Sequence, residues 1–318
     1  MGPDERAEAA PAGRPFAGAA HRRRRALRAR ALPFLLILPA ITMVVVLQLY
    51  PTLVGVWYAF HDVHLARLHQ TPFVGLRNFT SIFTGPFPNL LNPVIAVTGI
   101  WVIGSVIFHV GVGLGLALLL QQRWVKGRDL FRSLYLFPWV ISGIVVGYSW
   151  RFVFDPTVGL LNTLLVTFGM TPRPWLVTGP LAMGALLVAA TWRSAGYSLV
   201  LQMGGLQSIP DEVYEAAAID GVSGIRLLTR IILPLIRPFI LVNLITTTVE
   251  ALNAFDIVLA LTRGGPLFRT EIVSLYMYHQ GFQWGFLGKA AAVSVIVYLV
   301  STAMILAYVR FLHEEEAF

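Results

Sequence analysis

The side chains best suited to bind a ligand or carry an ion stand within stretches that are otherwise apolar. Thr246, Glu250 and Asn253 follow one another at i, i+4 and i+7, so on a helix they share one face. An ionisable group in such surroundings is costly and is therefore a candidate for function. A carboxylate and an amide can bridge neighbouring hydroxyl groups of a ligand. Glu250 or Asp256 could instead carry a proton or an ion.

A second apolar stretch adds Trp192, Arg193 and Tyr197, and the rings of Trp192 and Tyr197 could lie against the C–H groups of a ligand. These six residues are our candidates for function within the membrane. Other roles stay open for them. Thr246 and Asn253 could hydrogen-bond between helices, and Glu250 and Arg193 could form an ion pair with each other or across a subunit interface.

Catalytic chemistry has little support. The chain contains no cysteine, which excludes disulfides and thiol nucleophiles. His61, His64 and His69 stand near Asp62, but this pattern is more typical of a solvated loop than of a metal site. The segment 285–290 is the nearest approach to a phosphate-binding loop, and it has the wrong spacing and no hydroxyl residue. We expect no catalytic residue, no metal site and no cofactor bound by this chain.

The elements that must position these residues are long apolar runs. The chain has 318 residues, of which 56% are hydrophobic and 13% charged, with a mean hydropathy of +0.70. The runs are continuous and too long for barrel strands, so they predict helices. We predict an all-α integral membrane protein with six transmembrane helices. Their approximate ranges are 32–60, 93–120, 133–154, 180–203, 234–261 and 287–311.

Small residues and basic residues refine this prediction. The pairs Gly111-x3-Gly115 and Gly143-x3-Gly147 predict close helix packing. Of the 24 Lys and Arg residues, 16 fall on one side of the predicted spans, eight of them within residues 1–31. This bias predicts that both termini are cytoplasmic, and it assigns the net charge of +8 to lipid headgroups and topology, not to nucleic acid. We expect a basic, disordered tail at 1–31, a membrane domain at 32–312 and a short cytoplasmic tail at 313–318.

The connection between the fourth and fifth predicted spans has its own pattern. Ser208-x-x-Asp211 resembles a helix-capping box, and Pro210 stands at the start of the helix. Gly221 can take the left-handed conformation that ends a helix, and a second helical stretch follows it as far as Pro234. We therefore predict two short helices that meet at a tight Asp-Gly turn on the cytoplasmic face.

This connection resembles the EAA loop of permease subunits of binding-protein-dependent ABC importers. The motif is Glu215-Ala216-Ala217-x3-Gly221-x9-Ile231-x-Leu233-Pro234. Several segments are similar to carbohydrate permeases of the maltose type, and the resemblance covers about residues 33–312. These segments are 126–128 with 131–135 and 138–141, Trp192-Arg193 with Gly196-Tyr197, Leu261-Thr262-x-Gly264-Gly265-Pro266, and Gly288-x-Ala290-Ala291-Ala292.

The resemblance implies that the first EAA helix is a coupling helix that docks on a cytoplasmic ATPase. By this likeness Glu215 contacts the ATPase, Ala216 and Ala217 permit close docking, and Asp220 and Gly221 form the turn. Ile231, Leu233 and Pro234 complete the motif. ATP and Mg would then be bound by the partner ATPase, and closure of two ATPase copies would drive alternating access.

The resemblance also implies further partners and a location. These are a second permease subunit in a heterodimer, an extracytoplasmic solute-binding protein, and the lipid of a bacterial or archaeal cell membrane. The expected cargo is an oligosaccharide, a sugar or a glycerol-phosphate-type solute, and the resemblance implies that the six polar and aromatic candidates named above are substrate-pathway residues. The alternatives are a secondary transporter driven by an ion gradient through Glu250 or Asp256, and a membrane-embedded enzyme, for which no convincing active-site residues stand at one interface.

Overall fold

The computed structural model describes residues 34–122 and 124–313. Within these residues the chain is helical, and its extended pairings are three isolated bridges. The predicted all-α class is confirmed. The tail expected at 1–31, and all but the first residue of the one expected at 313–318, lie outside the described residues.

The chain divides into two units, residues 1–55 and 56–318. The described part of the first unit is helical, with a π-helical segment η1 (Val45–Leu49), and none of its residues is buried. It belongs to an apolar helix, Phe34–Ala59, whose last part is α2 (Tyr50–Ala59). An apolar helical segment in which no residue from 34 to 55 is buried has a surface suited to lipid or to another helix.

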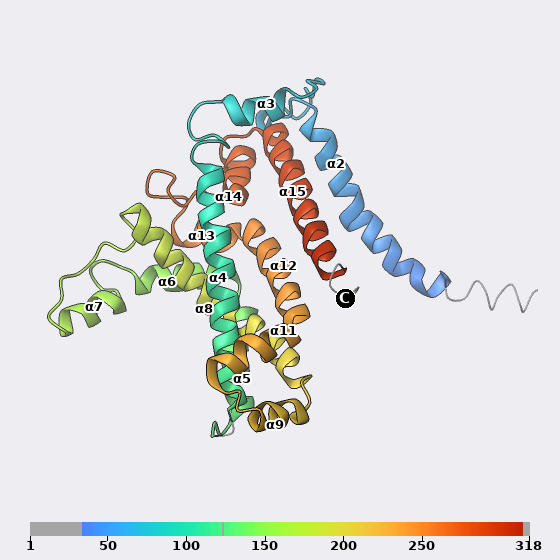
Figure 1. The fold of residues 1–318 in the computed structure, drawn as a ribbon. Coiled ribbons are helices and arrows are strands. Elements are labelled where there is room, and N and C mark those ends of the chain that lie inside the picture. The colour runs from blue at the N-terminus through green and yellow to red at the C-terminus, as the bar shows by residue number, and fades with distance from the viewer. Residues whose placement is uncertain (1–33, 123, 314–318) are drawn as a thin grey trace, which may run out of the picture. The chain divides into compact units, whose positions relative to one another are not determined.

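The second unit holds the remaining helices (Figure 1). In chain order they are η2 (Leu65–Arg67), α3 (Arg77–Thr84), α4 (Val94–Gln121), α5 (Arg128–Val140), α6 (Gly143–Val153), α7 (Leu160–Thr167), α8 (Gly179–Gln207), α9 (Asp211–Ile219), α10 (Gly224–Leu227), η3 (Leu228–Ile232), α11 (Leu233–Leu235), α12 (Arg237–Asn253), α13 (Phe255–Leu261), α14 (Val273–Tyr278), η4 (His279–Gln283) and α15 (Leu287–His313).

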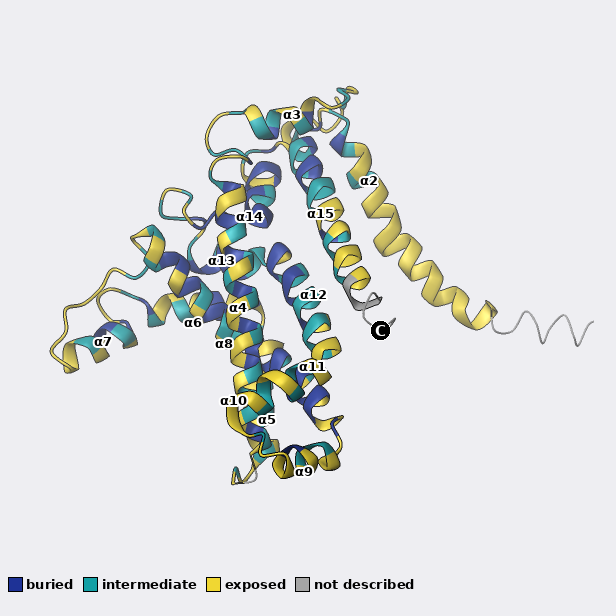
Figure 2. Cartoon of the chain, viewed as in Figure 1, coloured by how far each residue is buried: buried dark blue, intermediate teal, exposed yellow. Residues whose placement is uncertain are grey.

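Helices α4 and α8 run side by side in the same direction. The α4 backbone lies close to α8 at Gly113, where an added Cβ would collide with Ser198 and Leu199. Gly111 and Gly115 do not mediate close packing within this chain, where both glycines face open space. The buried residues of α4 recur every three or four positions, and apolar side chains on its other side are exposed (Figure 2).

Two of the predicted spans are not single straight helices. Helices α5 and α6 meet at an angle of 100° around Ile141 and Ser142, whose backbones are extended. The predicted fifth span is interrupted at Ala254, between α12 and α13. The pair Gly143 and Gly147 does mediate close packing, since their backbones lie against Asp256 and Ala260 of α13. These breaks place backbone and side chains of α5, α6 and α12 beside α8.

The number of membrane spans stays a prediction. By length and composition, three described helices could cross a membrane: Phe34–Ala59, Val94–Gln121 and Leu287–Arg310. Counting each of two bent helix pairs as one span raises the total to five. Helix α8 is long enough at 29 residues but is not among them. Its polar residues, described below, lower its hydropathy.

The short segments between spans are ordered by local hydrogen bonds. Helix α7 follows a turn that begins at Asp155. The Asp155 carboxylate accepts hydrogen bonds from the backbone N–H groups of Thr157 and Val158, at 2.8 and 3.0 Å, and from the Thr157 hydroxyl. These bonds favour the charged form and hold the pKa of Asp155 below its usual value.

Candidate functional site

A cavity of about 650 Å³ lies between α5, α8, α12 and α15. Four of the six substrate-pathway candidates line it. They are Arg193 and Tyr197 from α8, and Thr246 and Glu250 from α12. Ile245, Val249 and Ile305 supply an apolar wall, and Trp139 supplies a second aromatic ring. The volume is in the range of pockets that hold small molecules.

One side of the cavity carries an ion pair. Arg193 Nη1 lies 3.3 Å from Glu250 Oε1, and the Ser194 hydroxyl donates to the same oxygen at 3.3 Å. Arg193 Nε also donates to the Ile141 carbonyl at 3.1 Å, at the bend between α5 and α6. The arginine is thus oriented from two directions. The mutual ion pair, one of the roles left open for these residues, is present.

Another part of the lining is aromatic. The rings of Trp139 and Tyr197 are stacked, with centroids 5.2 Å apart and an interplanar angle of 24°. The cavity therefore combines flat apolar rings with a carboxylate and a guanidinium group, which suits a ligand with both C–H faces and hydroxyl groups. Trp139 was not among the candidates. Its place directly after Pro138, in a segment already matched to carbohydrate permeases, was the signal that could have found it.

The other two candidates do not line the cavity. Trp192 lies one position before Arg193 on α8 and so points elsewhere, with its ring edge-on to Trp150 at 5.9 Å. Asn253 ends α12, and its side-chain amide donates to the Val249 carbonyl at 2.8 Å. Thr246 lines the cavity, but its hydroxyl lies 3.0 Å from the Val242 carbonyl of its own helix.

A buried polar layer joins the helices beside the cavity. The Ser198 hydroxyl donates to Asn243 Oδ1 at 3.1 Å, and the Thr247 hydroxyl lies 3.3 Å from the same oxygen. Gln202, fully buried, donates from its amide to the Val110 carbonyl at 3.0 Å. These residues were not chosen as candidates. The spacing of Ser198 and Gln202, four apart within an apolar helix, marks one polar face and could have indicated this layer.

The predicted EAA segment forms two short helices. Gly221 has a φ of +71° and separates α9 from α10, as the Asp-Gly turn predicted. The predicted capping by Ser208 is wrong, because its hydroxyl donates to the Gly205 carbonyl and so closes the end of α8. Val213, Tyr214 and Ala217 face the rest of the unit, and Ala217 is only 4% exposed.

The opposite face of α9 is open. Its exposed residues include Glu212, Glu215, Ala216 and Ile219, at i, i+3, i+4 and i+7 of the helix. Ile219 is 86% exposed. The remaining motif residues have mixed positions: Asp220, Gly221 and Pro234 are exposed, whereas Ile231 and Leu233 are half-buried.

Helix α9 is attached to the far ends of α4 and α8. Gln121, the last residue of α4, donates from its amide to the Tyr214 hydroxyl at 3.2 Å. An apolar cluster that includes Leu120, Leu206, Ile209 and Ile232 joins these ends to the loop. The opposite end of α4 packs near α14, so α9 and α14 lie at the two ends of one long helix (Figure 1).

The chain is similar to known proteins in both sequence and structure. Residues 109–313 match the family described as "Binding-protein-dependent transport system inner membrane component". The trehalose/maltose transport system permease protein MalF of Thermococcus litoralis is 33% identical, over 89% of this chain and 94% of that protein. The sn-glycerol-3-phosphate transport system permease protein UgpA of Brucella abortus is 34% identical, over 90% of this chain and 96% of that protein.

The fold resembles solved transporter structures. A chain of a bacterial ABC transporter involved in the import of the acidic polysaccharide alginate superposes with a TM-score of 0.78 at 23% identity. The superposition covers 91% of this chain and 98% of that one. The bacterial alginate transporter in complex with a periplasmic protein bound to alginate pentasaccharide gives a TM-score of 0.74 at 22% identity, over 88% of this chain and 94% of that one.

Proposed function

Because this chain belongs to the family of binding-protein-dependent transport system inner membrane components, we propose that its cavity between α5, α8, α12 and α15 is a binding site on a carbohydrate pathway. The chain is a membrane-spanning permease subunit of an ATP-driven carbohydrate importer. The relatives favour this function over transport driven by an ion gradient.

The lining of the cavity carries the proposal. The stacked rings of Trp139 and Tyr197 offer a flat apolar surface to a sugar ring. Glu250 retains a second carboxylate oxygen beyond the one that faces Arg193, and that oxygen can accept a hydrogen bond from a hydroxyl group. With 34% of its side chain exposed, Glu250 is accessible to a ligand without losing its partner.

The open face of α9 supports a role in coupling. Glu215 and Ala216 lie on that face, so we assign to them, with Ile219, the contact with a cytoplasmic ATPase. Ala217 faces its own chain, and we assign to it the close seating of α9 against α4 and α8 instead of contact with the ATPase. Gly221 supplies the turn that returns the chain to the bundle.

Helix α8 provides a mechanical link from this loop to the cavity. It runs without a break to Gln207, just before α9, and it carries Arg193 about 21 Å and Tyr197 about 15 Å from that end. The contact between Gln121 and Tyr214 ties α9 to α4 as well. A displacement of α9 by an ATPase would therefore move the cavity side chains of α8 relative to Glu250 on α12.

The complete importer requires other chains. We propose two copies of a cytoplasmic ATPase that binds ATP and Mg, a second and related permease subunit, and an extracytoplasmic solute-binding protein. The family description includes a binding protein, and a solved neighbour is held together with a periplasmic one. The bias of the basic residues supports our proposal that both termini lie on the cytoplasmic side. The family is described as an inner membrane component, so the proposed location is a bacterial or archaeal cell membrane, which the chain crosses several times.

Two tryptophan variants test the cavity. Trp139 and Trp192 are both half-exposed, at 39% and 46%, but only Trp139 lines the cavity. An aromatic contact contributes about 0.5–1.5 kcal/mol beyond its area, so Trp139→Ala should lower ATP-driven sugar uptake by the assembled importer by at least about twofold. Trp192→Ala is the matched control. Equal uptake by the two variants would contradict the assignment.

A further inference from the structure

A second cavity, distinct from the first, lies toward the end of the bundle opposite α9. We call it the outer cup. It measures about 420 Å³ and is lined by side chains from α6, α13, α14, η4 and the loop after α13. The residues that matter here are Tyr148, Arg263, Tyr278, His279, Gln283 and Trp284. With Phe268, which also lines it, the cup offers four aromatic rings together with a guanidinium, an imidazole and an amide.

The loop that carries Arg263 has an unusual backbone. Among the described residues, the non-glycine positions with positive φ are Arg263, Leu267 and Phe268, at 53°, 48° and 61°. Two of these three line the cup. Side chains in this conformation are strained, and such strain is found at sites where the backbone must present a particular group.

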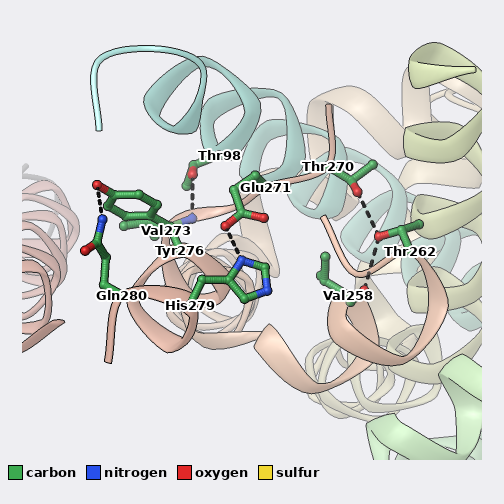
Figure 3. A network of polar contacts seen from close by, with 9 residues as sticks. All are labelled: Thr98, Val258, Thr262, Thr270, Glu271, Val273, Tyr276, His279 and Gln280. Carbon is green, nitrogen blue, oxygen red and sulfur yellow. Dashed lines mark hydrogen bonds and ion pairs between the residues drawn. The ribbon is translucent and has the colours of Figure 1, made fainter. Parts of the chain in front are cut away.

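Polar contacts behind the cup hold this loop in place. The Thr270 hydroxyl lies 2.7 Å from both the Thr262 hydroxyl and the Gly265 carbonyl oxygen. The Thr98 hydroxyl of α4 accepts a hydrogen bond from the Val273 N–H at 2.9 Å, which ties the start of α14 to α4 (Figure 3). The loop is thus a fixed part of the bundle.

His279 is aimed into the cup by a buried carboxylate. Its Nδ1 lies 2.6 Å from Oε1 of Glu271, which is fully buried (Figure 3). Burial raises the pKa of Glu271. If Glu271 is ionised, Nδ1 donates to it and Nε2 of a neutral ring can accept. If Glu271 is protonated, it donates to Nδ1 and Nε2 carries the hydrogen. In both cases Nε2 has no hydrogen-bond partner in the described part of the chain, and a ligand can engage it.

The two cavities differ in charge. Arg193 in the first cavity is neutralised by Glu250, 3.3 Å away. Arg263 in the cup has no carboxylate within ion-pair distance among the described residues. No acidic residue lines the cup, since Glu271 stands behind His279. The cup therefore has positive charge, aromatic faces and hydrogen-bonding groups together.

We propose that the outer cup is a second substrate site, which takes a sugar bearing a phosphate or carboxylate group before it reaches the first cavity. Arg263 pairs with the anionic group, Trp284 and Tyr278 contact the sugar ring, and His279 and Gln283 hydrogen-bond its hydroxyls. This rests on the proposed function, that the chain moves a carbohydrate. It adds to that function a place of entry and a preference for charge.

Binding to the full-length chain in nanodiscs tests the cup without requiring transport. The probes are glucose 6-phosphate and, for comparison, glucose. Glucose 6-phosphate should bind at least tenfold more tightly than glucose, and Arg263→Gln should remove that preference. Arg269→Gln, an exposed arginine of the same loop outside the cup, should leave it unchanged. Because His279 is buried and its variant could fold poorly, the exposed Gln283→Ala provides a second variant, which should weaken both probes by threefold or more.

Three results would overturn the proposal. The first is equal binding of the two probes, or a preference that survives Arg263→Gln. The second is displacement of glucose 6-phosphate by an anionic lipid added to the nanodisc, which would make the cup a headgroup site. The third is weaker association of Arg263→Gln with the solute-binding protein while sugar binding stays unchanged, which would make it a protein-docking surface. None of these depends on the first cavity, whose failure is read from uptake by the Trp139 and Trp192 variants.

Discussion

Replacing Glu250 with glutamine separates a substrate-binding carboxylate from one that serves only to hold helices together. Glutamine keeps the size of the side chain and an oxygen that can face Arg193 Nη1 and the Ser194 hydroxyl, both 3.3 Å from Oε1 in the native protein. The charge is lost, and the second carboxylate oxygen is replaced by an amide NH2 group, which donates a hydrogen bond but cannot accept one. The change therefore tests whether the cavity needs a carboxylate for its ligand.

The structure sets the size of the expected effect. Two unit charges 3.3 Å apart attract by about 5 kcal/mol at an effective dielectric constant of about 20. The two side chains are 21% and 34% exposed, so solvent screening and desolvation reduce the net stabilisation to roughly 1 kcal/mol. Assembly of Glu250→Gln should survive that loss. A hydrogen bond from a sugar hydroxyl to a charged group contributes about 1.5–3 kcal/mol, which predicts a 10- to 150-fold fall in kcat/KM for uptake.

The assay is the initial rate of sugar uptake by the complete importer in proteoliposomes that contain ATP. The control is the double variant Arg193→Gln, Glu250→Gln, in which neither charge remains. If Glu250 only neutralises Arg193, removing both charges restores uptake, whereas a lost ligand contact leaves it low. We expect it to remain low. Recovery in the double variant, or uptake by Glu250→Gln within twofold of the native protein, would refute the reasoning.

Three further predictions concern the coupling loop and the packing of the bundle. The chain has no cysteine, so a single Ile219→Cys should form a disulfide with a cysteine introduced in the ATPase cleft. Ala217→Cys should not form one, because Ala217 is buried. Equal cross-linking of the two variants would contradict the orientation of α9. Gly113→Ala should lower the free energy of unfolding in detergent by about 1–3 kcal/mol, because the added methyl group collides with α8. Gly111→Ala should change it little, because Gly111 faces open space. A larger loss for Gly111→Ala than for Gly113→Ala would refute the packing of α4 on α8. Gly221→Ala should weaken coupling, because a residue with a side chain at a φ of +71° costs about 1 kcal/mol. The measurement is the ratio of sugar uptake to ATP hydrolysis, which should fall. An unchanged ratio would contradict the need for glycine at this turn.

The sequence was informative wherever a local pattern decides the outcome. The spacing of Thr246 and Glu250 placed them correctly on one helix face, and both line the cavity. The Asp-Gly turn at Gly221 follows from backbone conformation alone. The all-α class follows from the length of the apolar runs, because only a helix forms all the backbone hydrogen bonds of such a run within itself.

Other features depend on contacts that no local pattern specifies. Trp192 and Arg193 are adjacent in sequence, yet they point about 100° apart around α8, and only the packing of α5 and α12 decides which one faces the cavity. The spacing of glycines in α4 does not show which of them contacts another helix. The register between α4 and α8 brings Gly113, and not Gly111, against α8. The 100° bend at Ile141 lets its carbonyl accept a hydrogen bond from Arg193, a contact between residues far apart in the chain.

Substrate protection of a single cysteine tests the central claim most directly. The native chain has no cysteine, so Thr246→Cys places one thiol in the cavity and Asn253→Cys places one outside it, on the same helix. In the complete importer supplied with ATP and its binding protein, the transported sugar should slow alkylation of the thiol at position 246 severalfold and leave position 253 unchanged. Equal alkylation at position 246 with and without sugar would contradict the assignment of this cavity to the transport pathway.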